Sequence, residues 1–523
     1  MRSLTPLGVL GFILAVSSAD AATIMGTVKG PDGQPFRGAF VQARNAQLKM
    51  TVSVLTDKEG RYVVENLPAG DYRVGIRAVG YSAAAKNGLK LTAEQNLPSQ
   101  DFALATGSVK WTDLSILQGI ELLPNDRGKN VLVEDCMSCH GFQSKMAAVT
   151  RDLDGFRSRV EYMREAMRSS LADRRGFSDQ QAEDIAYYMN KMFGYDSVLP
   201  KSPAELPAYK STVTEFSDDA LKIVYVDYDM PGPDRSPWTA HPDKDGTFWI
   251  PQYGASNRVA HFNPQTGEMK EFRVPNLGPA LIHSAVPAPD GSIWVAQAGS
   301  KKLGRFDPKT EKWEEFEHDW RKHTIVAHPD GSIWSTGGLT RFDPKTKTYT
   351  KIPEVPTAYG IGVDKEGTVW FSQMTKDGTI GKVDPKTLRV TKYIPPFRDR
   401  TRRMQISDNG TIWFAVYDDS RIGKFDPKSE TFKDYALPHK QTKPYALGLA
   451  TDGQVWYSSY YRDVMGKLDP DSGKVIEYPM PYVDNGMRDF FVAKDGRMWF
   501  ATPPNNKVGY FYVSNRQRSA EAR

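Results

Sequence analysis

Two cysteines and a histidine lie within five positions of a 523-residue chain. Cys136 and Cys139 are the only cysteines, and His140 follows directly in the stretch VEDCMSCHGF. A disulfide between residues three apart closes a very small loop and constrains little of the unfolded chain. C-x-x-C-H instead matches the attachment pattern of a c-type haem, in which both thiols bind the haem covalently and the histidine ligates the iron. We therefore predict one covalent haem c at Cys136 and Cys139, with His140 as the proximal iron ligand.

Two other roles for a C-x-x-C pair fit the sequence less well. A thioredoxin-like redox pair lies beside a βαβ pattern, and the flanking sequence shows none. A structural zinc site needs two further ligands, but the next histidine after His140 is His241.

The residues after the motif predict a helix that packs against it. In FSDQQAEDIAYYMNKMFG, Ser178 and Gln181 form the capping-box pattern of a helix start, and Gly194 can end the helix. The apolar positions recur with helical spacing: they are Ala182, Ile185, Ala186, Met189 and Phe193. Together with the C-x-x-C-H turn, this pattern makes residues 112–197 similar to a small all-α class I cytochrome c domain.

The resemblance implies a methionine as the second axial iron ligand, between the motif and the last helix. The methionines of this region are Met146, Met163, Met167, Met189 and Met192. The first follows His140 too closely to reach the opposite face of the haem, and the last two lie in the last helix, where core packing is their ordinary role. Met163 in VEYMREAMRSS is the preferred ligand, with Met167 one helical turn later in reserve. A thioether ligand raises the haem potential relative to a second histidine.

Seven related stretches fill the second half of the chain. Examples are PAPDGSIWVAQ, VDKEGTVWFSQ and ISDNGTIWFAV, each with a turn dipeptide followed by a tryptophan. The tryptophans recur at intervals of 36–45 residues, the period of a propeller blade with four short strands. They are Trp249, Trp294, Trp334, Trp370, Trp413, Trp456 and Trp499. We predict a hairpin turn at each Asp-Gly or equivalent, and a tryptophan on the following strand that packs between blades.

A second repeat follows in the blades, as in GRFDPKT, GKVDPKT and GKFDPKS, where Asp-Pro begins a tight turn before an outer strand. The last blade lacks its own outer strand, and residues 221–230 offer a matching one ahead of the first tryptophan. We expect this strand to complete blade seven and close the ring. The two repeats resemble the virginiamycin B (streptogramin) lyase family, which implies a seven-bladed β-propeller over residues 216–515.

Alignment of the blades on their turns predicts one channel-facing residue per blade, at the start of each innermost strand. These residues are Trp238, His283, His323, Tyr359, Arg402, Tyr445 and Arg488. Aromatic, histidine and arginine side chains that converge on one channel suit an anionic or aromatic small molecule. The alternative is that they fill the channel and bind nothing. His328 lies in a Pro-Asp-Gly turn and is expected at the surface.

Lyases of the resembled family use histidine, glutamate and a bound magnesium ion. The histidine position is kept at His283 and His323, but the glutamate position holds no carboxylate in any blade. Its occupants are Gln252, Gln297, Gly337, Gln373, Val416, Ser459 and Thr502. Because glutamine is neither a general base nor a charged ligand for Mg²⁺, the sequence favours neither bound Mg²⁺ nor lyase activity.

Residues 22–108 alternate strand-like runs with Pro-Asp-Gly, Lys-Glu-Gly and Pro-Ala-Gly turns. The elements GTV, TDKEGRY and LPAGDY resemble the carboxypeptidase regulatory-like domain, which implies a small β-sandwich with an accessory role. We expect this part to act as a spacer or docking module.

The first 21 residues have the pattern of a secretory signal peptide. Arg2 gives a positive start, residues 7–16 are apolar, and Ala19-Asp20-Ala21 has the form of a cleavage site. A retained anchor is the alternative, but the apolar run is shorter than a membrane span. Export and haem attachment together predict a periplasmic protein with no transmembrane segment after cleavage. The formal charge of +5 gives no sign of a nucleic-acid partner, and residues 516–523 form a polar tail.

The sequence thus predicts a multidomain, mainly β protein: a β-sandwich, a small all-α haem domain and a C-terminal seven-bladed propeller. The function it favours is haem-based electron transfer, with a propeller that binds a substrate or a periplasmic redox partner, as in a dehydrogenase or its electron-accepting subunit. Two alternatives stay open: a carbon–oxygen lyase with an attached cytochrome, and a non-catalytic scaffold that positions the cytochrome.

Overall fold

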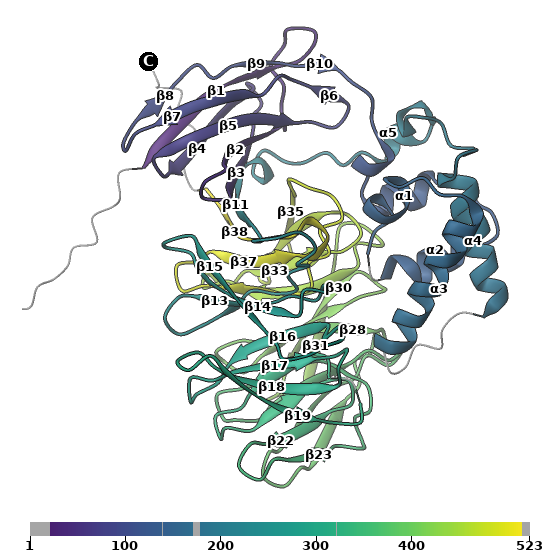
Figure 1. The fold of residues 1–523 in the computed structure, drawn as a ribbon, viewed down its shortest axis with the longest axis vertical. Helices are drawn as coiled ribbons and strands as arrows, with labels where there is room; N and C mark the ends of the chain where they lie inside the picture. Colours follow the sequence, from purple (N-terminus) through teal and green to yellow (C-terminus); the bar gives the residue numbers. More distant parts are fainter. Residues whose placement is uncertain (1–20, 139, 171–177, 321, 515–523) are drawn as a thin grey trace, which may run out of the picture.

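The computed structural model describes residues 21–138, 140–170, 178–320 and 322–514, with the backbone alone at residues 138 and 166–170. Nearly all of the predicted signal peptide, Cys139, the side chain of Met167 and the predicted polar tail therefore lie outside the described residues. The protein is mainly β, and Figure 1 shows strands at the top, a helical segment at the right and a propeller-like domain below. Among the described helices, none is long and apolar enough to cross a membrane.

The N-terminal part is the predicted β-sandwich, built from two small sheets. One sheet contains β1 (Ala22–Lys29), β4 (Arg61–Leu67), β8 (Asn96–Leu97) and β9 (Phe102–Ala103). The other contains β2 (Phe40–Asn45), β3 (Met50–Leu55), β5 (Gly70–Arg77) and β7 (Lys86–Leu91). A short pair, β6 (Tyr81–Ser82) and β10 (Ala105–Thr106), lies at the edge. Alternate apolar residues such as Ile24, Val41 and Val64 are fully buried between the sheets, as the period of a strand requires.

In the described residues between the sandwich and the propeller there are five α-helices and several short helical turns. The helices are α1 (Ile116–Leu122), α2 (Lys129–Glu134), α3 (Leu153–Ser170), α4 (Asp179–Phe193) and α5 (Tyr209–Thr212). The turns are η1 (Trp111–Asp113), η2 (Cys136–Ser138), η3 (Gln143–Ala147) and η4 (Pro203–Glu205). The capping box predicted for α4 is confirmed, because Ser178 accepts from Gln181 N–H and donates its own N–H to the Gln181 side chain. The apolar face predicted for α4 is buried.

In the described part of the chain, seven four-stranded antiparallel units form the propeller, and the first six run in chain order from their innermost strand. Blade one contains β12 (His241–Pro242), β13 (Phe248–Pro251), β14 (Arg258–Asn263) and β15 (Glu268–Arg273), and blade two contains β16 (Ile282–Pro287), β17 (Ile293–Gln297), β18 (Lys302–Asp307) and β19 (Lys312–Glu317). Blade three contains β20 (Ile325–Ala327), β21 (Ile333–Ser335), β22 (Thr340–Asp343) and β23 (Thr348–Lys351). Blade four contains β24 (Ala358–Val363), β25 (Val369–Gln373), β26 (Ile380–Val383) and β27 (Val390–Tyr393).

The last three units show how the ring closes. Blade five contains β28 (Thr401–Ile406), β29 (Ile412–Val416), β30 (Arg421–Asp426) and β31 (Thr431–Ala436). Blade six contains β32 (Pro444–Leu449), β33 (Val455–Ser459), β34 (Val464–Leu468) and β35 (Val475–Pro479). Blade seven contains β36 (Phe490–Val492), β37 (Met498–Thr502) and β38 (Lys507–Val513), and its fourth strand is β11 (Ile223–Asp229). β11 precedes the first blade in sequence and pairs with β38 along its full length. The prediction that this strand completes blade seven is confirmed.

The repeated sequence motif explains both the turns and the packing of the blades. The glycine of each predicted turn, such as Gly291 and Gly410, has a φ of 78–88°, which a residue with a Cβ adopts only with strain. Each tryptophan lies on the second strand and is at most 5% exposed. Trp334, for example, packs against Ile361 and Phe371 of the next blade. Trp499 of the last blade packs on Phe248 of the first, with ring centroids 4.2 Å apart, so the same contact closes the ring.

The sandwich is joined to the propeller by a continuous sheet. β3 pairs with β11 in antiparallel register from Tyr225 opposite Ser53 to Tyr228 opposite Met50. The result is one eight-stranded sheet in the order β36-β37-β38-β11-β3-β2-β5-β7. An ion pair between Arg44 and Asp229, 2.7 Å long, crosses the same junction. The N-terminal part is therefore docked on blade seven by backbone hydrogen bonds, which also cover the otherwise open edge of β11.

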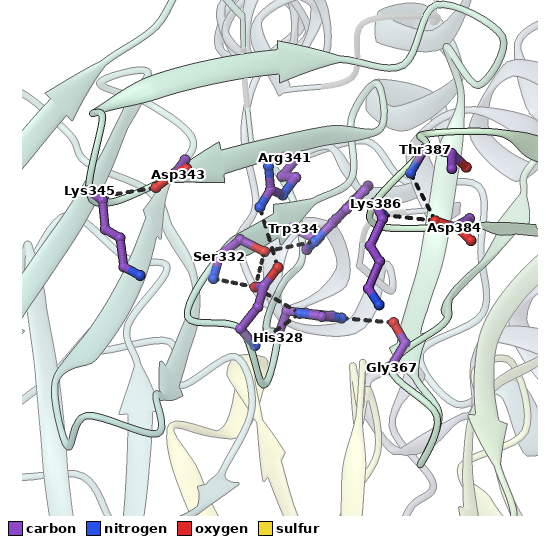
Figure 2. A network of polar contacts seen from close by, with 11 residues as sticks. His328, Ser332, Trp334, Arg341, Asp343, Lys345, Gly367, Asp384, Lys386 and Thr387 are labelled. Carbon is purple, nitrogen blue, oxygen red and sulfur yellow. Dashed lines mark hydrogen bonds and ion pairs between the residues drawn. The ribbon is translucent and has the colours of Figure 1, made fainter.

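His328 differs from its predicted position at the surface, since it is only 5% exposed. Figure 2 shows why: the ring lies between the turn of its own blade and the turn of the next. Nε2–H donates to the carbonyl of Gly367 at 2.7 Å, and Nδ1 accepts from the N–H of Asp330 at 3.1 Å. The prediction was wrong because the neighbouring turn covers a position that would be exposed in an isolated hairpin.

Replacing His328 with alanine is expected to lower the free energy of unfolding by about 1–2 kcal/mol, because the buried carbonyl of Gly367 loses its donor. Chemical denaturation followed by circular dichroism measures this change. His439→Ala is the matched control, since that side chain is half exposed, and it should cost less than about 0.5 kcal/mol. Equal stability of the two variants would show that the link between the turns does not stabilise the ring.

Candidate functional site

The seven residues predicted to face the channel do meet in one ring. His283, Tyr359, Arg402 and Tyr445 each occupy the second position of an innermost strand, and the other three lie two or three residues before such a strand begins. Four innermost strands, β16, β24, β28 and β32, carry a β-bulge at this point. A bulge bends the strand and redirects a side chain. The bulges therefore give a local reason why these side chains turn into the channel.

Consecutive members of the ring contact one another all the way round. The order is Trp238, His283, His323, Tyr359, Arg402, Tyr445, Arg488 and again Trp238. Neighbours lie 3.7–5.2 Å apart, measured between ring centroids or from guanidinium carbon to ring centroid. Trp238 and His323 keep partial exposure, whereas the other five are buried. We call these seven residues the channel ring.

The channel ring is richer in positive charge than its sequence pattern indicated. Arg403 lies directly behind it and donates to the hydroxyl of Thr324 at 2.5 Å. Its guanidinium is 3.7 Å from Asp489, whose pKa is raised by burial. Tyr417 and Tyr460 add further aromatic faces beside Arg402 and Arg488. Sequence analysis missed these four residues, although Arg403 and Asp489 each directly follow a predicted ring residue.

The histidines of the ring are neutral. Burial lowers the pKa of His283 and of His323 well below the ordinary value, and the nearby arginines lower it further. The indole N–H of Trp238 donates to Nε2 of His283 at 2.9 Å. Because indole can only donate, His283 must carry its proton on Nδ1.

Tyr359 and Tyr445 form a coupled pair whose hydroxyl groups are hydrogen-bonded to each other. Burial alone would raise the pKa of Tyr445, but Arg488, Arg402 and Arg403 outweigh it and lower that pKa to about 8. The pKa of Tyr359 is raised to about 12 by burial and by its partner. The ring can therefore hold a proton on Tyr359 and release one from Tyr445 within a mildly alkaline range.

A spectrophotometric titration should reveal one tyrosine with a pKa of about 8, which disappears in Tyr445→Phe. Arg402→Gln should raise that pKa, because the cation that stabilises the phenolate is gone. The ultraviolet absorbance of tyrosinate is the measurement. If every tyrosine titrates at or above about 10 in the native protein, the arginines do not act on Tyr445 as described.

The helical segment packs over the mouth of this ring. Apolar residues near the cysteine motif, including Met137, Phe142 and Met146, share one buried cluster with Tyr359 and Tyr445. Asp484, which immediately precedes blade seven, accepts from the N–H of Gly141 at 2.9 Å. A Cβ at position 141 would lie 3.1 Å from the Asp484 carboxyl carbon, so the glycine permits this close approach.

A second contact ties the same face of the propeller to the helices. The hydroxyl of Tyr461 donates to the carbonyl of Val133 at 3.2 Å. The backbone carbonyl of Tyr461 accepts from the N–H of Leu117 at 2.9 Å. The sequence contained no periodic signal for Asp484 or Tyr461, because both lie in loops between strands.

The chemistry of the described part of the motif fits haem ligation. Nδ1 of His140 lies 2.8 Å from the carbonyl of Gly141, and since a carbonyl only accepts, Nδ1 carries the proton. Nε2 then holds the lone pair that an iron ligand needs, with the ring oriented by its second nitrogen. Met137 and Phe142 on either side are fully buried, which supplies the apolar surroundings of a haem pocket. Cys136 begins η2, and Cys139 lies outside the described residues.

The methionine candidates occupy different environments. Met146, Met189 and Met192 are at most 6% exposed and belong to the apolar core of the helical segment. Met163 lies on α3 and is partly buried outside that core, so its sulfur is not committed to packing there. Met163 therefore stays the predicted distal ligand, and Met167, whose side chain is outside the described residues, stays in reserve.

The positions that correspond to the glutamate of the lyase family are tied into the scaffold. The side-chain amides of Gln252 and Gln297 donate to Glu271 at 2.6 Å and to Glu315 at 2.8 Å. The amide of Gln373 donates to Thr357 at 3.1 Å. Within the described residues, no group of three or more His, Cys, Asp and Glu side chains is arranged to hold a metal ion.

Known proteins resemble two parts of the chain. Residues 345–518 match the virginiamycin B lyase family, and residues 23–105 match the carboxypeptidase regulatory-like domain. No curated protein matches the sequence. A streptogramin B lyase structure superposes with a TM-score of 0.51 at 20% identity, covering 56% of this chain and 98% of the lyase. Virginiamycin B lyase from Staphylococcus aureus superposes with a TM-score of 0.50 at 19% identity, covering 55% and 98%. The C-terminal domain is thus a β-propeller similar in fold to streptogramin B lyase, and the N-terminal part is similar to the carboxypeptidase regulatory-like domain.

Proposed function

We propose that this chain is an exported, periplasmic c-type cytochrome protein whose propeller binds the substrate or redox partner that exchanges electrons with the haem. The chain would then be a dehydrogenase or the electron-accepting subunit of one. Cys136 and Cys139 would hold the haem, His140 would ligate its iron, and Met163 would be the second protein ligand. The export pattern of the first 21 residues supports the assignment to the periplasm, where c-type haem is attached.

One observation carries the proposal: His140 and Gly141, at the end of the C-x-x-C-H motif, lie against the propeller close to the channel ring. His140 immediately precedes Gly141, whose N–H is bound by Asp484. Burial lowers the pKa of His140, and Arg488 of the channel ring is among the charged groups that lower it further. A ligand in the channel would therefore lie on the same side of the propeller as the haem-binding residues.

A bound haem supplies one-electron redox chemistry, and the chain's own residues set the conditions for it. The apolar cluster around Met137 and Phe142 provides an apolar surface beside the motif. The hydrogen bond from His140 Nδ1–H to the Gly141 carbonyl fixes the orientation of the ligand ring. In the channel, Tyr445 and Tyr359 can accept and pass a proton, which suits an oxidation that releases protons together with electrons.

The match to the virginiamycin B lyase family favours a second candidate function, a carbon–oxygen lyase with an attached cytochrome. Gln252, Gln297 and Gln373 argue against it, because their amides are bonded within the scaffold and give neither a base nor negative charge. A binding scaffold without catalysis is the remaining alternative.

The test is a haem stain of the denatured protein after expression in a periplasm with haem-attachment machinery, paired with oxidised and reduced absorption spectra. Covalent haem with a methionine–iron charge-transfer band is the expected result. Absence of covalent haem would overturn the proposal. Haem reduction on addition of a substrate supports a dehydrogenase, a magnesium-dependent elimination without haem reduction supports a lyase, and tight binding of a partner protein alone supports a scaffold.

A further inference from the structure

The channel ring contains more buried positive charge than its own carboxylates offset. Arg402, Arg403 and Arg488 are each at most 4% exposed. Asp489 faces Arg403, but in the part of the chain that the structure describes, Arg402 has no carboxylate within ion-pair distance. Its guanidinium instead lies 4.2 Å from the ring centroid of Tyr417 and 5.0 Å from that of Tyr445. A buried cation without an anion is costly, so the ring is poised to take up negative charge.

Unsatisfied hydrogen-bond donors point to the same conclusion. Nδ1 of His283, Nε of Arg402 and the hydroxyl of Tyr417 are buried atoms that have no hydrogen-bond partner among the described residues. Nδ1 of His283 must carry a proton, because Nε2 accepts from Trp238. Native proteins leave few buried polar groups unpaired, and here three donor atoms of the same channel await an acceptor. A ligand that brings oxygen acceptors and negative charge would satisfy them.

Aromatic faces make up most of the remaining wall. Besides Trp238, the rings of Tyr359, Tyr417, Tyr445 and Tyr460 stand beside the two arginines at 4.2–5.1 Å from guanidinium carbon to ring centroid. Such faces pack well on a flat apolar group and pair poorly with a strongly hydrated inorganic ion.

We propose that the channel ring binds a carboxylate carried by a flat aromatic group, with Arg402 and Arg488 as the cations that receive it. This assignment deepens the proposed function, since it names the chemical class that the propeller would bind. Bidentate recognition by a planar guanidinium distinguishes a carboxylate from a neutral analogue of the same shape. Trp238 and His323 are the two ring members that keep partial exposure.

Carboxylates from two sources fit this chemistry. One is a free aromatic acid, and the other is a propionate group of the haem expected at Cys136, Cys139 and His140. Both would be received by the same arginines, because the motif is docked over the ring. The two sources predict different behaviour when the haem is removed.

The experiment measures binding of benzoate, acetate and benzamide by calorimetry to the full-length haem protein and to a full-length Cys136→Ser, Cys139→Ser variant. If a free acid is the ligand, benzoate binds both proteins, more tightly than acetate, and the neutral benzamide does not bind. If a propionate fills the ring, benzoate binds only the haem-free variant. In either case Arg402→Gln weakens benzoate binding at least about tenfold, as expected for removal of a buried charge partner.

Arg389→Gln is the matched control, since Arg389 is exposed on the outer strand side of a blade and its loss should leave binding unchanged. If the haem-free variant does not fold, Arg402→Gln in the haem protein supplies the second readout: a lowered midpoint potential indicates a propionate, because a cation near the haem is lost. The proposal is overturned if benzoate binds neither protein. It is also overturned if benzoate binds both proteins and Arg402→Gln leaves its affinity unchanged. In either case the channel ring would hold water rather than a carboxylate. A haem stain is independent of these results, so failure of the ring and failure of haem attachment are told apart.

Discussion

Cys139→Ala abolishes stable covalent haem: this is the largest effect that we expect from any single substitution. With the second thiol gone, only Cys136 can bond to the haem, and the C-x-x-C-H turn no longer clamps it from two points. The denatured variant should therefore show almost no haem stain, and the native variant should lose the spectrum of ligated haem iron. Both are measured on protein from the same periplasmic expression as the wild type.

Ser138→Ala is the control for this experiment, because residue 138 lies between the two cysteines and offers no bond to the haem. It should keep wild-type haem content. Full haem content in Cys139→Ala after denaturation would contradict the assignment of the C-x-x-C-H motif to covalent haem. The propeller alone would then indicate the function.

The second large effect concerns stability. Trp334→Ala should lower the free energy of unfolding by about 3–5 kcal/mol, the cost of removing a large aromatic side chain from a closed core. Trp334 is fully buried and packs against Ile361 and Phe371 of the next blade. Its indole N–H also donates to Ser332 at 3.1 Å, so the substitution leaves a polar atom without its donor. Denaturant unfolding followed by circular dichroism is the measurement.

Trp334→Phe separates the two contributions. It keeps an aromatic ring between the blades and should lose less than half as much stability as Trp334→Ala. A loss of under about 1 kcal/mol for Trp334→Ala would mean that the blades collapse around the gap, contrary to the close packing seen here.

The propeller could be predicted from the sequence because its information is local and repeated. A turn glycine and a tryptophan three residues later recur in every blade, and an Asp-Pro turn recurs in most of them. Each of these features specifies a contact that the neighbouring blades repeat. The same register located Trp238, His283 and the other channel residues, since aligned positions of symmetric blades converge on one axis. The β-bulges that direct four of these side chains inward left no signal in the sequence.

Contacts between unlike parts could not be predicted in this way. Pairing of β3 with β11 joins segments far apart in the chain. The alternation of apolar and polar residues in either strand does not indicate which strand it pairs with. Asp484 and Tyr461 lie in loops, where burial depends on what docks there. His328 shows the same limit on a smaller scale, because the carbonyl of Gly367 that buries it belongs to another blade.

The eight-stranded sheet has a consequence for the segment inserted within it. The helices follow β10 of the sandwich and are followed by β11, which pairs with β3 of the sandwich, so the segment is tethered at both ends. Tethering converts its docking into an intramolecular event at an effective concentration on the order of millimolar. The bonds from Asp484 and Tyr461 can then be individually weak and still keep the motif over the channel most of the time. A free protein that competes for the same rim would have to match that local concentration, whereas a small molecule entering the ring would not.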